Sequence, residues 1–391
     1  MARGESLRYF IINRQEKGGS LFIKTLVRRI RKNRREVKCM KKLFALVLAL
    51  TMSLSLAACG SKTEASAVSA SASTPEASTS NKEATKPIVI SLSNAYSDMD
   101  QVNFELKAAA QRISERSNGA IDLKVYPNNT LGTPADAVEA IRSDAPLLYV
   151  TAFSQWEDYY PDACAIQAGF VFDSAEECVR FYDTDLFDEI VANLDAVNIH
   201  CINVSFTAGM RHVLGKKPIK TPDDMKGLKL RVPGSSPYLD CFNSLGASPM
   251  AMPSSEQVSA LSAGTIDAVD QSISLMYSTK TYELVKEATL LAQMPLADGL
   301  YCSTTFWNSL PEEYRNIIEE ELHTAGQNYY EYSMENEAIM RIDMEKAGVR
   351  FYEVDRAPFA ALAKENVLKY EIGQKVLDTV AQIRADIAAG K

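Results

Sequence analysis

Hydrophobic and polar residues alternate along residues 228–232 (LKLRV), where Lys229 and Arg231 stand between apolar neighbours. An alternation of period two is typical of a strand that is buried on one face. The strand is expected to end at Pro233-Gly234, because proline lacks a ladder donor and glycine adopts turn conformations. Similar patterns predict strands over residues 88–93, 121–127, 147–153, 199–206, 268–270 and 351–354.

Apolar residues spaced three or four apart predict helices between these strands. In residues 102–116, Phe104, Leu106, Ala109 and Ile113 are expected on one stripe, and Asn118-Gly119 closes the segment. Further helices are expected over residues 135–141, 176–193, 221–226, 235–245, 254–262 and 358–388. The alternation of strands and helices predicts an α/β fold with parallel sheets.

A long helical pattern begins at Pro311 and extends to Ala347, with Gly348 as its C-terminal cap. At about 37 residues it is well above the usual helix length. Gly326 lies inside it, so two interpretations remain open. The segment forms either two successive helices or one helix that spans two lobes.

Residues 40–58 have the features of an export signal. A short basic start precedes the uncharged run LFALVLALTMSLSL (43–56), which is too short to span a bilayer comfortably. The run ends in LAAC followed by Gly60-Ser61, which resembles a bacterial lipobox. We therefore expect cleavage before Cys59 and lipid on its sulfur. The alternative is a plain secretory signal with an incidental cysteine.

The segments on either side of this signal are not expected to fold. Residues 1–39 fit no signal, and we interpret them as an untranslated upstream extension with Met40 as the true start. Arg35-Glu36-Val37 can be encoded as AGG-GAG-GTN, which contains a purine-rich ribosome-binding sequence. Residues 59–86, the lipidated cysteine and a stretch rich in Ser, Ala and Thr, predict a flexible tether.

The charge distribution limits the partners. The chain has 42 Lys/Arg and 50 Asp/Glu residues, of which 14 Lys/Arg and 3 Asp/Glu lie in residues 1–58. The remaining chain has 28 basic and 47 acidic residues and therefore a net charge of −19. Such an acidic body argues against nucleic acid as a partner, since the binding of nucleic-acid phosphates needs clustered basic residues.

Five cysteines follow Cys59, and no two of them form a C-x-x-C pair. Buried free thiols are therefore expected, and a single disulfide stays open.

No catalytic constellation emerges from the residue pattern, and no metal or cofactor is expected. Basic residues do follow two predicted strands: Arg211-His212 after the Gly209 break, and Arg231. Ligands of open α/β sheets lie beyond the carboxyl ends of strands. Two guanidinium groups there suit a carboxylate, which they bind with parallel hydrogen bonds. His212 is more readily explained as solvated or packed.

The segment KPIKTPDDMKGLKLRVPGSSPYLDCFNSLGASPMAMPSSE (217–256) resembles the solute receptors of tripartite ATP-independent periplasmic (TRAP) transporters, the dicarboxylate-binding DctP-like family. ISERSNGAIDLKVYPNNTLG (113–132), YPDACAIQAGFVF (160–172) and LYCSTTFWNSLPEEYRNII (300–318) are also similar to family segments, in the same order. The likeness covers about residues 87–380.

The resemblance implies a two-lobed periplasmic-binding-protein-like α/β fold with a hinge and a long lobe-spanning helix. We expect lobe I over residues 87–208 and about 297–336, and lobe II over 209–296 and about 337–391. Ligand binds in the cleft, and the lobes close over it.

In this family the arginine that matches Arg231 pairs with a substrate carboxylate, and the one that matches Arg211 often lines the pocket. Gln271 stands where the family has a pocket asparagine, and Ser254 where it often has a phenylalanine. Asn94, Trp156 and Tyr159 are expected neighbours on the first lobe, from loop position alone. The residues after the third strand disfavour sialic acid as the ligand.

The resemblance therefore predicts a monomeric extracytoplasmic receptor, not an enzyme, held to the cell membrane by its lipid. It captures a small organic acid and delivers it to a TRAP membrane permease. Two alternatives stay open: the receptor of an ATP-driven (ABC-type) importer, and a non-transport sensor or hydrolase on the same fold.

Overall fold

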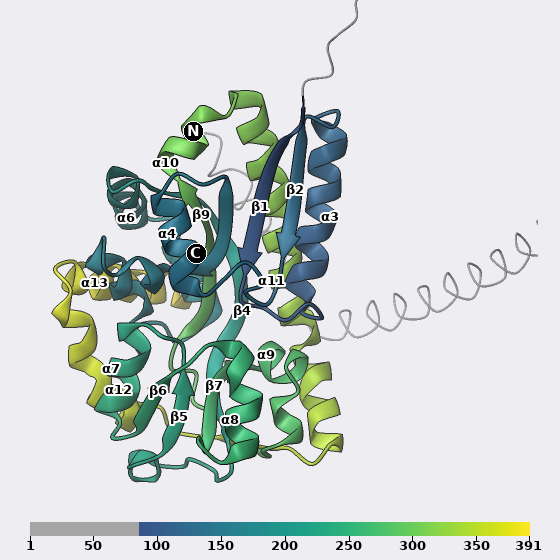
Figure 1. Ribbon diagram of the computed structural model, residues 1–391. Coiled ribbons are helices and arrows are strands. Elements are labelled where there is room, and N and C mark those ends of the chain that lie inside the picture. Colours follow the sequence, from purple (N-terminus) through teal and green to yellow (C-terminus); the bar gives the residue numbers. More distant parts are fainter. Residues whose placement is uncertain (1–85) are drawn as a thin grey trace, which may run out of the picture. The chain divides into compact units, whose positions relative to one another are not determined.

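The computed structural model describes residues 86–391 (Figure 1). The predicted upstream extension, the signal peptide, Cys59 and all but the last residue of the tether lie outside the described residues. The predictions for those segments are therefore not tested by the structure.

The strands of the described chain join into a ten-stranded sheet with the path β2-β1-β3-β9-β4-β7-β5-β6, while β8 pairs with β4 and β10 with β8. The strands are β1 (Ile88–Asn94), β2 (Ile121–Tyr126), β3 (Leu147–Ala152), β4 (Ile199–Gly215), β5 (Lys229–Val232), β6 (Ser248–Ala251), β7 (Ala268–Ser272), β8 (Glu287–Leu290), β9 (Pro295–Ser303) and β10 (Arg350–Glu353).

Two groups of parallel strands form the two lobes, and antiparallel strands join them. In the first lobe β1 pairs in parallel with β2 and β3, and in the second lobe β5 pairs in parallel with β6 and β7. Strand β4 pairs antiparallel with β9 over its first part and with β7 and β8 over its last part. The predicted two-lobed α/β fold is confirmed, and the crossing strands add antiparallel pairs that the pattern did not predict.

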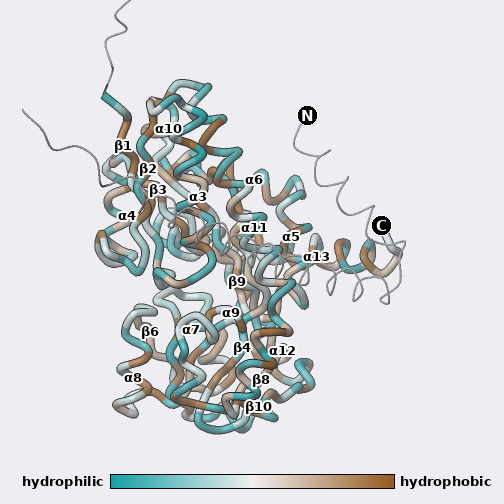
Figure 2. Tube along the Cα trace, turned by 90° about the vertical axis from the view of Figure 1, so that its right-hand side faces the viewer, coloured by the Kyte–Doolittle hydropathy of each residue, from teal (hydrophilic) through white to brown (hydrophobic). Residues whose placement is uncertain are grey.

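Helices cover both faces of each half-sheet (Figures 1 and 2). They are α3 (Gln101–Arg116), α4 (Pro134–Arg142), α5 (Ala175–Phe181), α6 (Asp185–Ala196), α7 (Ser236–Ser244), α8 (Gln257–Ala263), α9 (Ile273–Ser278), α10 (Thr304–Ser309), α11 (Glu312–Lys346), α12 (Ala357–Ala363) and α13 (Gly373–Ala388). Short 3-10 turns are η1 (Phe153–Trp156), η2 (Pro161–Gln167), η3 (Pro222–Met225), η4 (Ser254–Glu256), η5 (Thr281–Glu283) and η6 (Lys364–Lys369).

Helix α11 is one continuous helix of 35 residues. Its buried residues before Ser333 pack in a core cluster of the first lobe, and Met340 and Met344 pack in a cluster of the second. Gly326 does not interrupt it. A Cβ at Gly326 would lie 1.9 Å from Oγ of Ser205 on β4, so glycine permits close packing against the crossing strand. The interpretation of one lobe-spanning helix is therefore confirmed.

Strand β4 does not end near Gly209 as predicted. It continues to Gly215, with register shifts against β9 and a φ of +75° at Gly209. Glycine adopts this left-handed conformation without strain, so the strand bends there and leaves β9 for β7. Arg211 and His212 consequently lie inside a strand rather than in a loop after one.

The C-terminal helix packs in a different lobe from the one expected. Residues 337–391 were predicted to belong to lobe II, but Val376, Val380 and Ile383 of α13 join the first-lobe cluster of Phe172 and Phe181. The predicted helix 358–388 is divided into α12, η6 and α13, which lets the chain return to the first lobe. The predicted helix 176–193 is likewise divided, because the Thr184 side chain caps a new helix, α6.

Candidate functional site

Arg231 lies at the end of β5 and is buried, with 6% of its surface exposed. Its Nε donates to the carbonyl oxygen of Met252 at 2.9 Å. Within residues 86–391, no carboxylate forms an ion pair with it. Burial and the positive charge of Arg211 lower the pKa of Arg231 to about 10, although Asp270 and Tyr238 raise it. Arg231 is thus a buried cation that lacks an anion.

Arg211 lies on β4 and is fully engaged by Asp270 of β7. Its Nε donates to Oδ2 of Asp270 at 2.8 Å, and its Nη2 donates to the backbone oxygen of the same residue at 2.8 Å. The guanidinium carbon stands 5.1 Å from the centre of the Tyr238 ring. Burial lowers the pKa of Arg211, but the charge and hydrogen bond of Asp270, together with Tyr238 and Asp298, outweigh burial and raise the pKa. The charge of Arg211 is therefore compensated within the protein.

Gln271 and His212 are bound inside the second lobe. Oε1 of Gln271 accepts from Thr281 at 2.6 Å, and its Nε2 donates to Thr279 at 3.1 Å. Nδ1 of His212 accepts from the backbone N–H of Ala292 at 3.1 Å. Burial lowers the pKa of His212 to about 3, with repulsion from nearby arginines adding to the effect. His212 is a packed neutral histidine, in agreement with the simpler interpretation.

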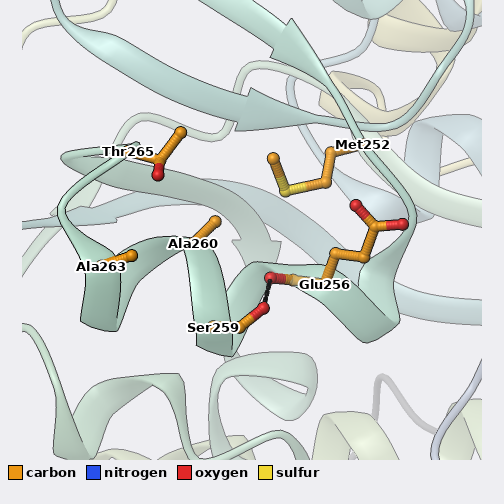
Figure 3. A pocket seen from close by; sticks show the side chains of 6 residues that line it. All are labelled: Met252, Glu256, Ser259, Ala260, Ala263 and Thr265. Carbon is orange, nitrogen blue, oxygen red and sulfur yellow. Dashed lines mark hydrogen bonds between the residues drawn. The ribbon is translucent and has the colours of Figure 1, made fainter.

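Ser254 begins η4, two residues beyond the Met252 carbonyl that accepts from Arg231, and its Oγ accepts from Gln257 at 3.3 Å. The next turn borders a pocket of about 290 Å³ that none of the seven predicted site residues lines (Figure 3). The lining residues are Met252, Glu256, Ser259, Ala260, Ala263 and Thr265. Glu256 is the only charged residue among them, so this pocket does not suit an anion.

Asn94 supports a first-lobe loop rather than offering a free polar group. Its Nδ2 donates to Asn103 at 2.8 Å, and its Oδ1 accepts from the backbone N–H of Tyr96 at 3.0 Å. The Tyr96 hydroxyl in turn donates to Oδ2 of Asp298 on β9 at 2.7 Å. Asn94 therefore positions Tyr96, and Tyr96 contacts a buried carboxylate.

Trp156 and Tyr159 make contacts within the first lobe. Trp156 is completely buried in the first-lobe core, where its ring meets Tyr301 edge to face at 5.1 Å. The Tyr159 hydroxyl donates to Glu139 at 3.2 Å, and Arg142 lies over its ring at 4.5 Å. Both side chains are used in the packing of the first lobe, because η1 folds back onto the sheet and onto α4.

Hydrogen bonds join the lobes on both sides of this region. Oγ of Ser278 on α9 donates to Oδ2 of Asp100, the N-cap of α3, at 2.7 Å. On the other side, Oγ of Ser235 donates to Oγ of Ser154 at 2.8 Å. Ser235 follows Arg231 by four residues, so Arg231 lies next to the contact between the lobes.

Three residues of this region were not predicted: Asp270 as the partner of Arg211, Tyr238 and Asp298. Alternation along β7 could have assigned Asp270 to a face of the sheet, but the register against β4 was unknown. Asp298 lies on β9, a strand that the hydrophobic pattern did not reveal because it is buried along its whole length.

Other kinds of site find little support in the part of the chain that the structure describes. No group of histidine, cysteine and acidic side chains there could hold a metal ion. The five cysteines of this part are all buried, and Cys164, Cys178, Cys241 and Cys302 are free thiols, as expected. Among residues 86–391, no helix has the length and apolar character needed to cross a membrane.

Comparisons with known proteins agree with this fold. Residues 92–373 match the family described as bacterial extracellular solute-binding protein, family 7. A TRAP periplasmic solute-binding protein from Fusobacterium nucleatum, solved with bound sn-glycerol-3-phosphate, is 32% identical with a TM-score of 0.75, over 77% of this chain and 99% of that one.

The descriptions of two further relatives name other ligands. A TRAP periplasmic solute-binding protein from Ochrobactrum anthropi with bound L-fuconate is 28% identical, with a TM-score of 0.70, over 75% of this chain and 99% of that one. The C4-dicarboxylate-binding periplasmic protein DctP of Rhodobacter capsulatus is 25% identical over 78% of this chain and 92% of its own. This chain belongs to the DctP family of extracellular solute-binding proteins, and it is an extracytoplasmic TRAP receptor and not an enzyme.

Proposed function

We propose that this receptor captures a small organic acid by pairing an anionic group of the ligand with Arg231. The observation that carries the proposal is the contrast between two neighbouring arginines. Arg211 is neutralised by Asp270, whereas Arg231 is buried beside it and has no carboxylate partner among the described residues. A buried unpaired charge is costly, and an incoming anion removes that cost.

A carboxylate is the ligand group that best fits this environment. Nε of Arg231 is held by the Met252 carbonyl, which orients the guanidinium plane and leaves its Nη groups for a ligand. The low dielectric between the lobes strengthens such a pair. A phosphate ester is the second candidate, because the 32% identical relative holds sn-glycerol-3-phosphate. Both groups present two or more oxygens to a guanidinium fork.

Closure of the lobes over the ligand is part of the proposal. Strand β4 and helix α11 each run through both lobes, so they are the elements in which a hinge can bend. The hydrogen bonds Asp100–Ser278 and Ser154–Ser235 join the lobes in this structure, and they would break when the lobes open to admit a ligand. The loaded receptor then delivers its ligand to the permease of a TRAP transporter. No specific observation favours an ABC-type importer or a sensor.

The attachment to the membrane rests on the sequence alone. We propose that Cys59 carries the lipid, that residues 60–86 form the tether and that the receptor works as a monomer. Expression of wild type and Cys59→Ala in a bacterial host tests the anchor. The wild type is expected in the membrane fraction with a diacylated N-terminal peptide by mass spectrometry, and Cys59→Ala in the released fraction. An unmodified Cys59 in the mature wild type contradicts it.

Calorimetric titration with a panel of carboxylates and phosphate esters tests the role of Arg231. We expect Arg231→Ala to lose at least about a hundredfold in affinity, or roughly 3 kcal/mol, because a buried cation without an ion-pair partner among residues 86–391 is removed. Lys229→Ala is the matched control, since Lys229 is an exposed cation on the same strand. It should bind as the wild type does. Unchanged affinity in Arg231→Ala would refute the proposal.

A further inference from the structure

Asp298 is a buried carboxylate at the end of the first-lobe sheet that faces the second lobe. It pairs with Ala152, the last residue of β3, and with Phe206 of β4. Only 8% of its surface is exposed. The Tyr96 hydroxyl donates to its Oδ2 at 2.7 Å. Nothing in the proposed pairing of ligand with Arg231 uses this side chain.

Asp298 has no ion-pair partner within residues 86–391. Arg211 is the nearest cation that acts on it, but two hydrogen bonds already commit Arg211 to Asp270. Burial raises the pKa of Asp298 to about 6, although the Tyr96 hydrogen bond and the Arg211 charge each lower it. At neutral pH the site therefore contains a second uncompensated charge, of the opposite sign to Arg231.

The order of the strands separates these two charges. Strands β9, β4, β7 and β5 are consecutive neighbours, and they carry Asp298, Arg211, Asp270 and Arg231 in that order. The two outer residues are also offset along β4, because Asp298 pairs with Phe206 before the bend at Gly209, whereas Arg231 pairs with Val269, which lies opposite Leu214 after the bend. Tyr238, whose ring lies 5.1 Å from the Arg211 guanidinium, is acted on by the charges of both Asp298 and Arg231. Arg231 and Asp298 are thus the positive and the negative end of one group of buried charges around Arg211 and Tyr238.

We infer that Asp298 is a specificity-determining residue that contacts the ligand end opposite to its anionic group. It accepts a hydrogen bond from a hydroxyl group there and rejects a second carboxylate. The inference rests on the proposed function, in which Arg231 holds the anionic end. The preferred ligands are hydroxylated acids with one anionic end, such as sugar acids or glycerol phosphate esters, and not C4-dicarboxylates.

The physical reason is electrostatic. A second carboxylate would meet the Asp298 carboxylate in a region where both are poorly solvated, and like charges in such a place repel strongly. A hydroxyl group instead completes the hydrogen bonding that Tyr96 begins. The four charged groups Arg211, Arg231, Asp270 and Asp298 sum to zero, so one added anion is tolerated more easily than two.

The preference for a hydroxyl group over a second carboxylate should depend on pH, because Asp298 can be protonated. The other titratable groups around it are Tyr96 of the β1 loop, Arg211 of β4, and the tyrosines whose pKa it raises, Tyr149, Tyr182, Tyr238, Tyr301 and Tyr329. All these tyrosines stay neutral and Arg211 stays charged between pH 5 and 8. Asp298 is therefore the group of this set that changes charge, and its protonation at lower pH removes the repulsion.

The experiment compares ligand pairs that differ only at the far end: galactonate with galactarate, and 4-hydroxybutyrate with succinate, with glycerol 3-phosphate as a one-ended phosphate. Calorimetry at pH 7.5 is expected to show the hydroxyl member binding at least about tenfold more tightly, or 1.4 kcal/mol. In Asp298→Asn, which keeps the shape and an acceptor for Tyr96, this preference should shrink towards equality. Asp158→Asn, an exposed first-lobe carboxylate, is the control and should keep the preference.

Three results would overturn the inference: a wild type that prefers the diacid members, an Asp298→Asn variant with an unchanged preference, or a wild type that binds no probe. The galactarate affinity relative to galactonate should also rise between pH 7.5 and 5.5 in the wild type and stay level in Asp298→Asn. Arg231→Ala separates the two proposals. If Arg231→Ala binds both members of a ligand pair with wild-type affinity, the proposed function is wrong, regardless of the result for Asp298→Asn.

Discussion

Asp270 accepts two hydrogen bonds from Arg211, at its side chain and at its backbone oxygen, and forms no ion pair with Arg231. Arg211 therefore has a structural role, and Arg231 keeps its charge for a ligand. If both arginines shared the Asp270 carboxylate, neither charge would be available to a ligand. Both β4 and β5 pair with β7, so the register decides the partner: Arg211 lies opposite Ser272, on the same face as Asp270, whereas Arg231 lies opposite Val269, on the other face.

Removal of the Arg231 charge should stabilise the ligand-free receptor and should abolish ligand binding. Arg231→Met replaces a buried unpaired cation by an apolar chain of similar length, so the free energy of unfolding without ligand should rise by about 1–3 kcal/mol. Urea denaturation without ligand measures this. Thermal unfolding with and without the ligand should then show no ligand-induced shift. A less stable empty Arg231→Met would mean that an unseen anion already compensates the charge.

Removing the Asp270 carboxylate should be strongly destabilising. Asp270→Asn leaves the buried Arg211 guanidinium without its counter-charge, which typically costs about 3–5 kcal/mol. Equilibrium unfolding of Asp270→Asn, Arg211→Met and the double variant forms a cycle that isolates the pair. The double variant should be less damaged than the sum of the single ones. Additive losses would show that the two side chains do not interact in solution.

The buried Asp298 should make stability depend on pH in a defined direction. Its pKa in the folded state, about 6, lies above the ordinary value of 3.8, so the folded protein holds the proton more tightly than the unfolded chain. Stability from this group is therefore lost as pH rises through 6. Asp298→Asn should be more stable than wild type at pH 7.5 by up to about 3 kcal/mol, with little difference near pH 4. An equal difference at both pH values contradicts this.

Gly326→Ala should destabilise the protein although alanine favours helices. The new Cβ would lie 1.9 Å from Oγ and 2.6 Å from Cβ of Ser205, so α11 would have to move away from β4. Overpacking of this kind costs about 1–3 kcal/mol, more than the helix propensity gains. Denaturation of Gly326→Ala and of Gly326→Ala with Ser205→Gly checks it. The second substitution removes the obstructing side chain and should restore part of the stability.

Local patterns predicted most elements whose signal lies within a few consecutive residues. The parallel strands β1, β2 and β5, helix α3 and the long α11 follow from alternation, helical spacing and end signals. The crossing strand β9 was missed, because burial along its whole length leaves no alternation. Helix α13 was placed in the wrong lobe, because an amphipathic helix does not specify which apolar surface it will cover.

For the site as well, features set by local sequence could be predicted, whereas contacts between distant parts of the chain could not. Arg231 could be singled out from its strand, its Pro-Gly break and the family resemblance. Trp156 and Tyr159 were chosen by loop position, and their rings pack against first-lobe residues; their contact with a ligand stays a prediction. Asn94 was expected to meet a ligand, and it holds the Tyr96 loop. Loop position does not determine where a side chain points, since that depends on what packs against it.

The sequence by itself determined the α/β class, the long helix and a cation at the end of β5, because these depend on residue types and short-range spacing. Only the tertiary structure decided which arginine is neutralised, since the register of β4 against β7 places Asp270 beside Arg211. It also placed Asp298, 67 residues after Arg231 in the chain, at the opposite end of the same row of strands. Charges that belong to different strands become one site only when the sheet forms, and their balance then sets what the site can bind.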